Sequence, residues 1–490
     1  MRAWNVVFLA ATAGHSAAQD PPPAHQATGT RVGEVTDASA LLWARLTKAP
    51  ARLAAGKQFV KGEKVTPKDL AGGPAAWRGA CPGMAGEMRV RFGKTRDLSD
   101  ARETSWAAVD QAGNFARTFA LTELEPATVY HYAVESRSAG AAHGALHGQF
   151  ETAPPPQQAA PLTFCVLNCL GWSDVDDPAA GYDIFPAMTK LKPKFAVFTG
   201  DSVYYDNDPP KTTSVPLAKF HWERLYSLPR HVDFLKNCAA YWEKDDHDAW
   251  GNNCDPTKAM PGWTYQDGAA LWRQQVPVGE NPYRTFRWGR DLQIWLLESR
   301  DFRSPNGAKD GPEKTLLGRE QKAWFFKTVA ESTAQWKVII SPTSLTGPPG
   351  KGKGGDNLGK AGFRTEGDEV RAFLKKTAPR NCYVLVGDVH AQSHAVHPQT
   401  GLNEFTVGPA GDRHAAKIQP DPAWHVFARS GGGFCSVQLT PGSAGSAISV
   451  RLHDSKGKTV HEWNGAPHAP PTPKAALPPS AKPGPAPVQH

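Results

Sequence analysis

Short runs of alternating apolar and polar residues dominate the first third of the chain. They occur in VTDASALLWARL (35–46), EMRVRFG (87–93) and FARTFALTELEPATVYHYAVESR (115–137). A period of two puts successive side chains on opposite faces of a strand, so each run predicts a strand with one buried face. Residues 32–152 are therefore expected to form a domain of antiparallel strands.

The pattern changes after the proline-rich joint at Pro154 to Ala159. Apolar strand-like runs then alternate with helical segments, and this rhythm predicts stacked sheets with helices outside. The predicted strands are PLTFCVLN (161–168), KFAVFTGD (194–201), DLQIWLLESR (291–300), QWKVIISP (335–342) and NCYVLVGD (381–388), and the predicted helices lie near 219–234, 318–333 and 367–376. Hairpins are expected over 433–463, so residues 160–464 form the second predicted domain.

The ends of the chain differ in composition from the two domains. Residues 1–18 combine Arg2, an apolar stretch and small residues up to Ala18, as in a secretory signal peptide. Residues 19–31 form a predicted linker, and residues 465–490 a Pro/Ala-rich tail expected to be disordered. No later segment is apolar enough to span a bilayer. We therefore expect a secreted or periplasmic protein without a transmembrane segment.

The net charge of +8 and the pI near 9.0 favour anionic substrates. The basic residues are spread along the chain, so no specific nucleic-acid partner is expected. Seven cysteines leave at least one thiol unpaired. Cys238 and Cys254 bracket an acidic segment and could form a disulfide. The sequence leaves the oligomeric state open.

Polar residues gather where four of the apolar segments end. In layered α/β proteins, active sites lie beyond the carboxyl ends of the strands. The residues at these ends are Cys169, then Asp201 and Tyr204, then Asp245 to Asp248 with Asn252 and Asn253, and then Asp388 and His390. Taken singly, each has an ordinary explanation as a turn, a solvated loop or a buried core residue. Their occurrence at four strand ends favours a metal site.

The donor types indicate which ions such a site would hold. Thiolate and phenolate ligands suit a highly charged ion such as ferric iron, whereas carboxylate and amide oxygens suit calcium. A carboxylate can bridge two ions, and a hydroxide held between them is a strong nucleophile at neutral pH. His247 could then protonate a leaving group or stabilise charge on a phosphoryl oxygen.

With these residues collected, the chain resembles the alkaline phosphatase D family, within the calcineurin-like metallophosphoesterases. The stretch LTELEPATVYHYAVE (121–135) also resembles the end of a fibronectin type III domain. The motifs that resemble the phosphatase family are VGEVTDASALLWARL (32–46), Asn168-Cys169, GDSVYYD (200–206), DDHDAWGNN (245–253), LESRDFR (297–303), LLGREQKAWF (316–325), WKVIIS (336–341) and GDVH (387–390).

The resemblance implies a mixed α+β and α/β fold. An immunoglobulin/fibronectin-III-like β-sandwich would precede a four-layer α/β/β/α metallophosphoesterase domain. It also implies an exported phosphodiesterase or alkaline phosphatase acting on a small-molecule or polymeric phosphate ester.

The resemblance further implies Fe³⁺ with one or two Ca²⁺ ions. Cys169, Asp201, Tyr204 and His390 would hold the iron, and Asp201 would bridge to calcium. Asp246, Asp388 and Asn252 or Asn253 would complete the calcium site. His247 would be catalytic, and Arg300 and Arg303 could hold phosphate oxygens.

The chain departs from the family pattern at Asn168, Lys244 and Glu298, where Ser, Trp and Asp are usual. These changes bear on substrate contacts more than on the metal ligands. Two alternatives stay open. One is a purple-acid-phosphatase-like monoesterase or 5'-nucleotidase, which Asp388 disfavours because those enzymes use histidine there. The other is a non-catalytic, calcium-dependent binding protein.

Overall fold

The structure is a computed structural model that describes residues 23–138, 141–347, 355–359, 362–378 and 380–465. The predicted signal peptide, part of the predicted linker and almost all of the predicted tail lie outside these residues.

The N-terminal domain is a β-sandwich made of two antiparallel sheets. One sheet has the order β1-β2-β6, with bounds Thr30–Gly33, Ala40–Arg45 and Ala116–Leu121. The other has the order β4-β3-β7-β8, and β5 also pairs with β3. Its bounds are β3 Gly86–Gly93, β4 Arg102–Glu103, β5 Ala107–Val109, β7 Val129–Ser138 and β8 Ala141–Glu151. The predicted alternation is seen in β7, whose buried residues include Tyr130, Tyr132 and Val134.

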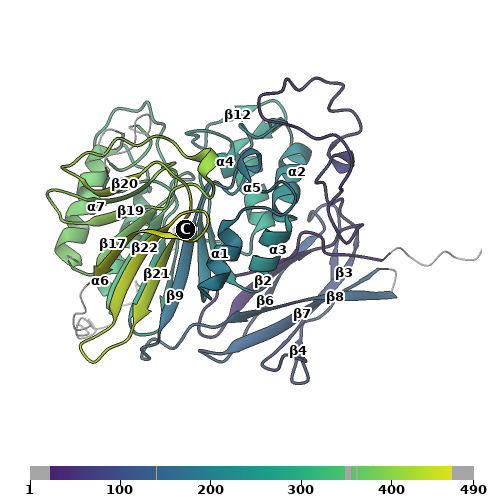
Figure 1. Ribbon diagram of the computed structural model, residues 1–490, viewed down its shortest axis with the longest axis horizontal. Coiled ribbons are helices and arrows are strands. Elements are labelled where there is room, and N and C mark those ends of the chain that lie inside the picture. Colours follow the sequence, from purple (N-terminus) through teal and green to yellow (C-terminus); the bar gives the residue numbers. More distant parts are fainter. Residues whose placement is uncertain (1–22, 139–140, 348–354, 360–361, 379, 466–490) are drawn as a thin grey trace, which may run out of the picture.

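Two larger mixed sheets form the second domain (Figure 1). The first has the order β11-β10-β9-β21-β22-β23, and β9, β10 and β11 run parallel. Its bounds are β9 Leu162–Leu167, β10 Phe195–Thr199, β11 Ala239–Glu243, β21 Phe434–Thr440, β22 Ala447–His453 and β23 Thr459–Gly465. The fully buried strands β10 and β11 explain the continuous apolar runs in the sequence.

The second sheet has the order β14-β15-β16-β17-β19-β18-β20. Within it, the neighbouring strands β15, β16, β17 and β19 run parallel to one another. Its bounds are β14 Arg284–Trp288, β15 Leu292–Leu296, β16 Trp336–Ser341, β17 Cys382–Val386, β18 Gln392–Val396, β19 Asn403–Thr406 and β20 His425–Arg429. Strands β18, β19 and β20 carry polar side chains among the apolar ones, so the continuous apolar runs of the sequence did not predict them.

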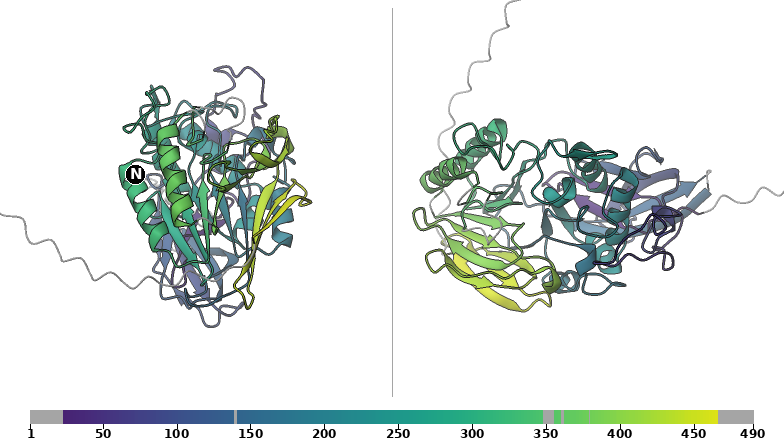
Figure 2. Two further views of the ribbon diagram at one scale, coloured as in Figure 1. Left: turned by 90° about the vertical axis from the view of Figure 1, so that its left-hand side faces the viewer. Right: turned by 90° about the horizontal axis from the view of Figure 1, so that it is seen from above.

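Helices cover the outer face of each large sheet. The helices beside the first sheet are α1 Ile184–Lys190, α2 Val215–Tyr226, α3 Pro229–Leu235, α4 Asp246–Ala249 and α5 Tyr265–Gln275, and a small hairpin of β12 Ala259–Met260 and β13 Trp263–Thr264 lies near α5. Helices α6 Arg319–Glu331 and α7 Arg364–Thr377 cover the second sheet. In both views of Figure 2, the green helices α6 and α7 lie on one side of the layered domain and the yellow strands β22 and β23 lie on the opposite side. The arrangement confirms the expected sandwich followed by a layered α/β domain.

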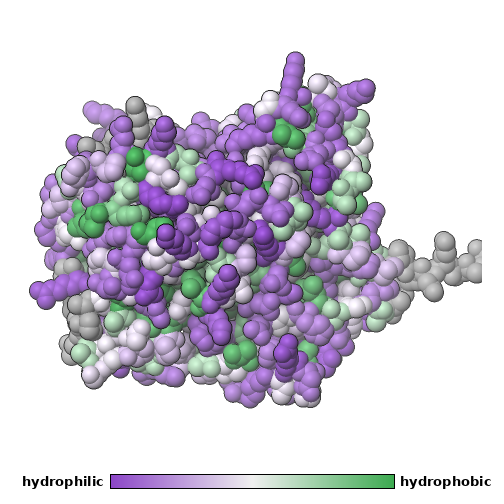
Figure 3. Space-filling view, in the orientation of Figure 1, coloured by the Kyte–Doolittle hydropathy of each residue, from purple (hydrophilic) through white to green (hydrophobic). Residues whose placement is uncertain are grey.

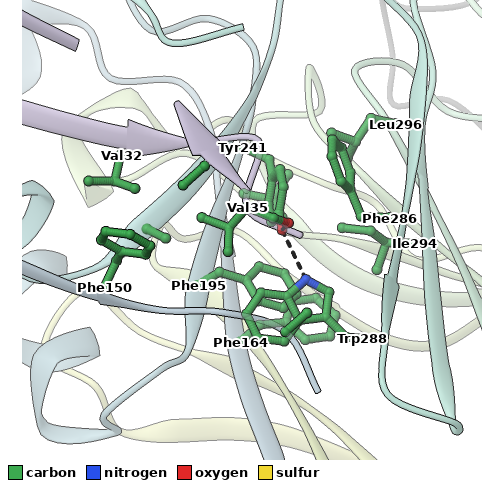
Figure 4. Packing of buried hydrophobic residues seen from close by; sticks show 14 of the residues in the cluster. Val32, Val35, Phe150, Phe164, Phe195, Tyr241, Phe286, Trp288, Ile294 and Leu296 are labelled. Carbon is green, nitrogen blue, oxygen red and sulfur yellow. Dashed lines mark hydrogen bonds between the residues drawn. The ribbon is translucent and has the colours of Figure 1, made fainter. Parts of the chain in front are cut away.

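One hydrophobic cluster joins the two domains. Val32 and Val35 of the sandwich belong to the same buried cluster as Phe195 of the first large sheet and Ile294 of the second (Figure 4). The Trp288 indole also donates a hydrogen bond of 2.9 Å to the Tyr241 hydroxyl inside this cluster. Burial of apolar surface is the main favourable term in such packing, so the sandwich is joined to the two large sheets through a common core.

The face in Figure 3 is mostly hydrophilic, with hydrophobic residues scattered among polar ones. Within the described ranges, no helix has the length and apolar character needed to cross a membrane.

All seven cysteines are described and all are buried free thiols, so the suggested Cys238–Cys254 bridge is wrong. The Cys238 thiol contacts the Pro193 carbonyl, whereas the Cys254 thiol contacts that of Asp246.

Candidate metal centre

The turn that follows β10 gives the site its central carboxylate. Asp201 lies after Gly200 and adopts a left-handed backbone conformation, with φ of 52°. A Cβ atom on Gly200 would lie 2.4 Å from Cβ of Asp245, so only glycine allows the ends of β10 and β11 to approach this closely. Strained backbone of this kind at a non-glycine residue is typical of functional sites.

Two further donors lie beside Asp201, as the sequence predicted. Cys169 follows β9 and also has a positive φ, of 51°. Its sulfur lies 3.5 Å from Oδ2 of Asp201, and the Tyr204 hydroxyl donates to the same oxygen at 3.0 Å. Burial, together with the charges of Asp201 and Cys169, raises the pKa of Tyr204 well above its ordinary value. A bound cation would stabilise the phenolate and so allow the Tyr204 hydroxyl to ionise.

Acidic side chains from the other strand ends meet at the same place. Donor atoms of Asp201, Asp245, Asp246 and Asp388 all lie within 4.8 Å of one another, and all four residues are buried. Asp201 also groups at this spacing with Cys169 and His390, and separately with Asp246 and His247. A carboxylate common to all three groups has the position that a bridging ligand needs. Asp388, like Cys169 and Asp201, has a positive φ.

The two asparagines differ in their surroundings. The side-chain oxygen of Asn253 is buried and has no hydrogen-bond partner among the described residues. Asn252 is exposed, and its backbone N–H donates to Asp206. The structure therefore favours Asn253 over Asn252 as an amide oxygen ligand.

His247 lies beside the cluster and is held by a carboxylate. Its Nδ1 is 2.5 Å from Oδ1 of Asp206, and its ring packs 4.2 Å from that of Tyr204. Burial by itself would lower the pKa of His247, but the charges of Asp246 and Asp201 and the bond to Asp206 raise it to about 10. Cations between the carboxylates would offset part of that charge.

The donor set fits bound cations. Burial raises the pKa of Asp201 and of Asp245 well above the ordinary value, and the neighbouring carboxylates add to the shift at both. Oδ1 of Asp201 and Oδ2 of Asp245 are buried and accept no hydrogen bond from the described part of the chain. Buried carboxylates are costly unless a cation or donor compensates them, so these oxygens match a metal centre.

Comparison with known proteins decides the family. The profile of the PhoD-like phosphatase family matches residues 164–420, and that of the PhoD-like phosphatase N-terminal domain matches residues 11–154. This chain is a member of the PhoD-like phosphatase family. Alkaline phosphatase D of Bacillus subtilis (strain 168) is 24% identical over 317 residues, which are 55% of this chain and 52% of that protein. The match thus spans about half the length of the curated relative.

Solved structures show the same fold. A structure described as that of PhoD covers 90% of this chain and 89% of its own, with a TM-score of 0.69 and 18% identity. Purple acid phosphatase PPD1 from yellow lupin (Lupinus luteus) seeds covers 91% of this chain and 77% of its own, with a TM-score of 0.58 and 12% identity. At these identities the likeness concerns the fold. The two-sheet domain that carries the acidic cluster of this PhoD-like phosphatase therefore has the fold seen in those two structures.

Arg300 and Arg303 contact carboxylates in this PhoD-like phosphatase. The fully buried Arg300 lies 2.5 Å from Oδ1 of Asp245 and 2.8 Å from Asp356, while Arg303 lies 2.7 Å from Asp356. Arg300 therefore orients Asp245 at the edge of the cluster. That the two arginines bind phosphate stays a prediction.

Sequence reasoning missed Asp206, Asp174 and His414 at the PhoD-like site, and it did not show what Lys244 contacts. Asp206, which holds His247, is the last residue of the GDSVYYD motif, so that motif carried the missing signal. Lys244 lies buried between Glu298 and Asp301, at 2.7 and 2.9 Å. Asp174 and His414 form a 2.6 Å pair beside Tyr204, and they are 240 residues apart in the chain. No local sequence pattern links residues at that separation.

Proposed function

We propose that this chain is an exported, metal-dependent phosphodiesterase or alkaline phosphatase that hydrolyses small-molecule or polymeric phosphate esters. The observation that carries the proposal is the meeting of Cys169, Tyr204, His390 and three further buried aspartates around Asp201 in a PhoD-like phosphatase domain. Two hard or borderline ions in such a site would polarise a phosphoryl oxygen and activate water.

The donors suggest Fe³⁺ on one side of Asp201 and one or two Ca²⁺ ions on the other. Thiolate and phenolate from Cys169 and Tyr204, with His390, suit the trivalent ion. Asp246, Asp388 and the amide of Asn253 supply the oxygen ligands that calcium prefers.

His247 is the group in this chain best placed to assist bond cleavage. Asp206 fixes its ring through Nδ1, which leaves Nε2 as the atom that can donate a proton to a leaving oxygen or to a phosphoryl oxygen. The overall positive charge of the chain supports an anionic substrate.

Export rests on the N-terminal sequence, with Arg2, the apolar stretch and small residues up to Ala18. Amino-terminal sequencing of the protein recovered outside the cytoplasm should find a start near Gln19. An uncleaved Met1 would contradict this part of the proposal.

The deciding experiment measures hydrolysis of an aryl phosphate diester and the matching monoester by one preparation, before and after a calcium chelator. We expect activity that chelation removes and calcium restores, and the diester-to-monoester ratio then defines the class. His247→Ala should keep its metal and lose most turnover. His397→Ala is the control, because His397 is similarly buried but packs on Trp424, outside the metal cluster. No turnover by folded, metal-loaded protein would favour the non-catalytic binding protein.

A further inference from the structure

The loop that joins β2 to β3 of the sandwich, residues 46–85, packs against the second domain. Phe59, Trp77 and Ala80 of this loop form one buried cluster with Leu217 and Phe220 of α2. The Trp77 ring lies 4.7 Å from the Phe59 ring and 5.2 Å from the Phe220 ring. In Figure 1 the dark-purple loop lies beside α2 at the top of the view, the end of the molecule at which α4 is also drawn. The N-terminal domain therefore contributes a packed segment to this end of the second domain.

The loop brings one ammonium group close to the candidate metal centre through a series of direct contacts. Lys61 Nζ lies 3.3 Å from Oδ2 and 3.4 Å from Oδ1 of Asp174. Oδ2 of Asp174 lies 2.6 Å from Nδ1 of His414. The His414 ring is 4.9 Å from the Tyr204 ring, and its Nε2 is at a hydrogen-bond distance of 3.3 Å from Nε2 of His390. The side chains of Asp174 and His414 thus connect Lys61 to Tyr204 and His390.

The lysine lies on the side of the centre that solvent reaches. In the donor group of Cys169, Asp201 and His390, the first two residues are buried and His390 is partly exposed. The side chain of Lys61 is 52% exposed, whereas that of Asp174 is 8% exposed. An anion that approaches the centre past His390 therefore comes near the Lys61 ammonium group.

The ion pair between Lys61 and Asp174 is a loose one. Charge-assisted contacts between an ammonium group and a carboxylate are usually about 2.7–2.9 Å long, and both contacts of Lys61 are longer. The short contact of Asp174 is with His414. By contrast, Lys57 of the same loop lies 2.8 Å from Asp69. Because an ammonium group has three N–H donors, the half-exposed Lys61 can also donate to a second anion.

We propose that Lys61 is a specificity-determining residue that binds a second anionic group of the substrate while the scissile phosphate lies at the metal centre. This inference rests on the proposed function and narrows its substrate class to phosphate esters with a second phosphate-like group near the scissile one. Because Lys61 belongs to the sandwich, both domains then contact the substrate.

The test compares two aryl phosphate diesters, a propyl ester and the same ester with a phosphonate at the end of the propyl chain. The phosphonate has the charge of a second phosphate and is not hydrolysed. We expect the metal-loaded, full-length wild type to have a kcat/KM about fivefold or more higher for the phosphonate ester, mainly through a lower KM, because one ion pair in solvent contributes about that much. This preference should decrease as the ionic strength rises from about 0.1 M to about 1 M, since salt screens exposed charges.

Lys61→Met keeps the length of the stem and should abolish the preference, whereas Lys61→Arg should keep most of it. Lys57→Met is the control and should keep the wild-type preference, because Lys57 is 41% exposed on the same loop but pairs with Asp69. The proposal is overturned if the wild type shows no preference, if Lys61→Met retains it, or if folded Lys61→Met is inactive on both esters. Each of these results leaves the proposed function standing. No turnover of either ester by the wild type would instead refute the proposed function and this subsite together.

Discussion

Lys244 provides a test of how the polar network beside the buried acidic cluster contributes to stability. Its side chain is 1% exposed and lies 2.7 Å from Glu298, 2.9 Å from Asp301 and 3.0 Å from the Tyr265 hydroxyl. Lys244→Met keeps the length of the stem and removes the charge. The variant leaves the carboxylates of Glu298 and Asp301 in the interior without the lysine ammonium group that they share.

The structure sets the size of the effect. Removing one partner of a buried ion pair costs about 3–5 kcal/mol, because the other charge stays buried. Here the remaining carboxylates keep other partners. Glu298 accepts from the backbone N–H groups of Arg300 and Asp301, and Asp301 accepts from Tyr265. We therefore expect the lower end of the range, about 3 kcal/mol, which is more than 100-fold in the folding equilibrium.

The loss should depend on pH with a definite sign. Although burial lowers the pKa of Lys244, Asp301 and Glu298 raise it well above its ordinary value, so wild-type Lys244 is charged throughout the neutral range. Without the lysine, the folded-state pKa of Glu298 and Asp301 rises above that of the unfolded chain. Folding then takes up protons, so the stability of Lys244→Met relative to the wild type should recover as pH falls from 8 to 5.

Urea denaturation followed by tryptophan fluorescence measures the difference at pH 8, 7, 6 and 5. Arg319→Met is the control, because Arg319 and its partner Glu313 are both more than 80% exposed and their pairing should contribute little. Glu298→Gln added to Lys244→Met should recover part of the loss. Equal stability of Lys244→Met and wild type at pH 8, or a deficit that does not change with pH, would refute the reasoning.

Four further predictions concern the site and the thiols. Asp206→Asn should lower kcat by about 10²-fold or more with unchanged metal content, because His247 loses its orienting carboxylate. Metal analysis and diester kinetics test this prediction, with the surface variant Asp97→Asn as the control. Gly200→Ala should abolish activity and metal binding, because its Cβ would overlap Asp245; retained activity would show that the turn can shift. Tyr204→Phe should remove the visible tyrosinate-to-iron absorption of the iron-loaded protein, and an unchanged band would exclude Tyr204 as a ligand. Thiol titration in denaturant without reductant should find seven free thiols, whereas five would reinstate a disulfide.

Local sequence determined the elements that carry the chemistry. Buried strands such as β10 and β17 appear as continuous apolar runs, because both faces of each strand are covered. Polar residues directly after such runs lie at the carboxyl ends of parallel strands, where this fold collects its ligands. The grouping of Asp201 with Cys169, Asp246 and Asp388 could therefore be predicted from positions along the chain alone.

Only the tertiary structure decided which side chains support those ligands. Arg300 reaches Asp245 across 55 residues, and His414 reaches Asp174 across 240, through contacts that depend on how the two sheets stack. The absence of a Cys238–Cys254 bridge follows from different neighbours in space, which spacing along the chain does not encode. Hydrophobic periodicity fixes which face of a strand is buried, whereas long-range polar contacts depend on the packing of complete layers.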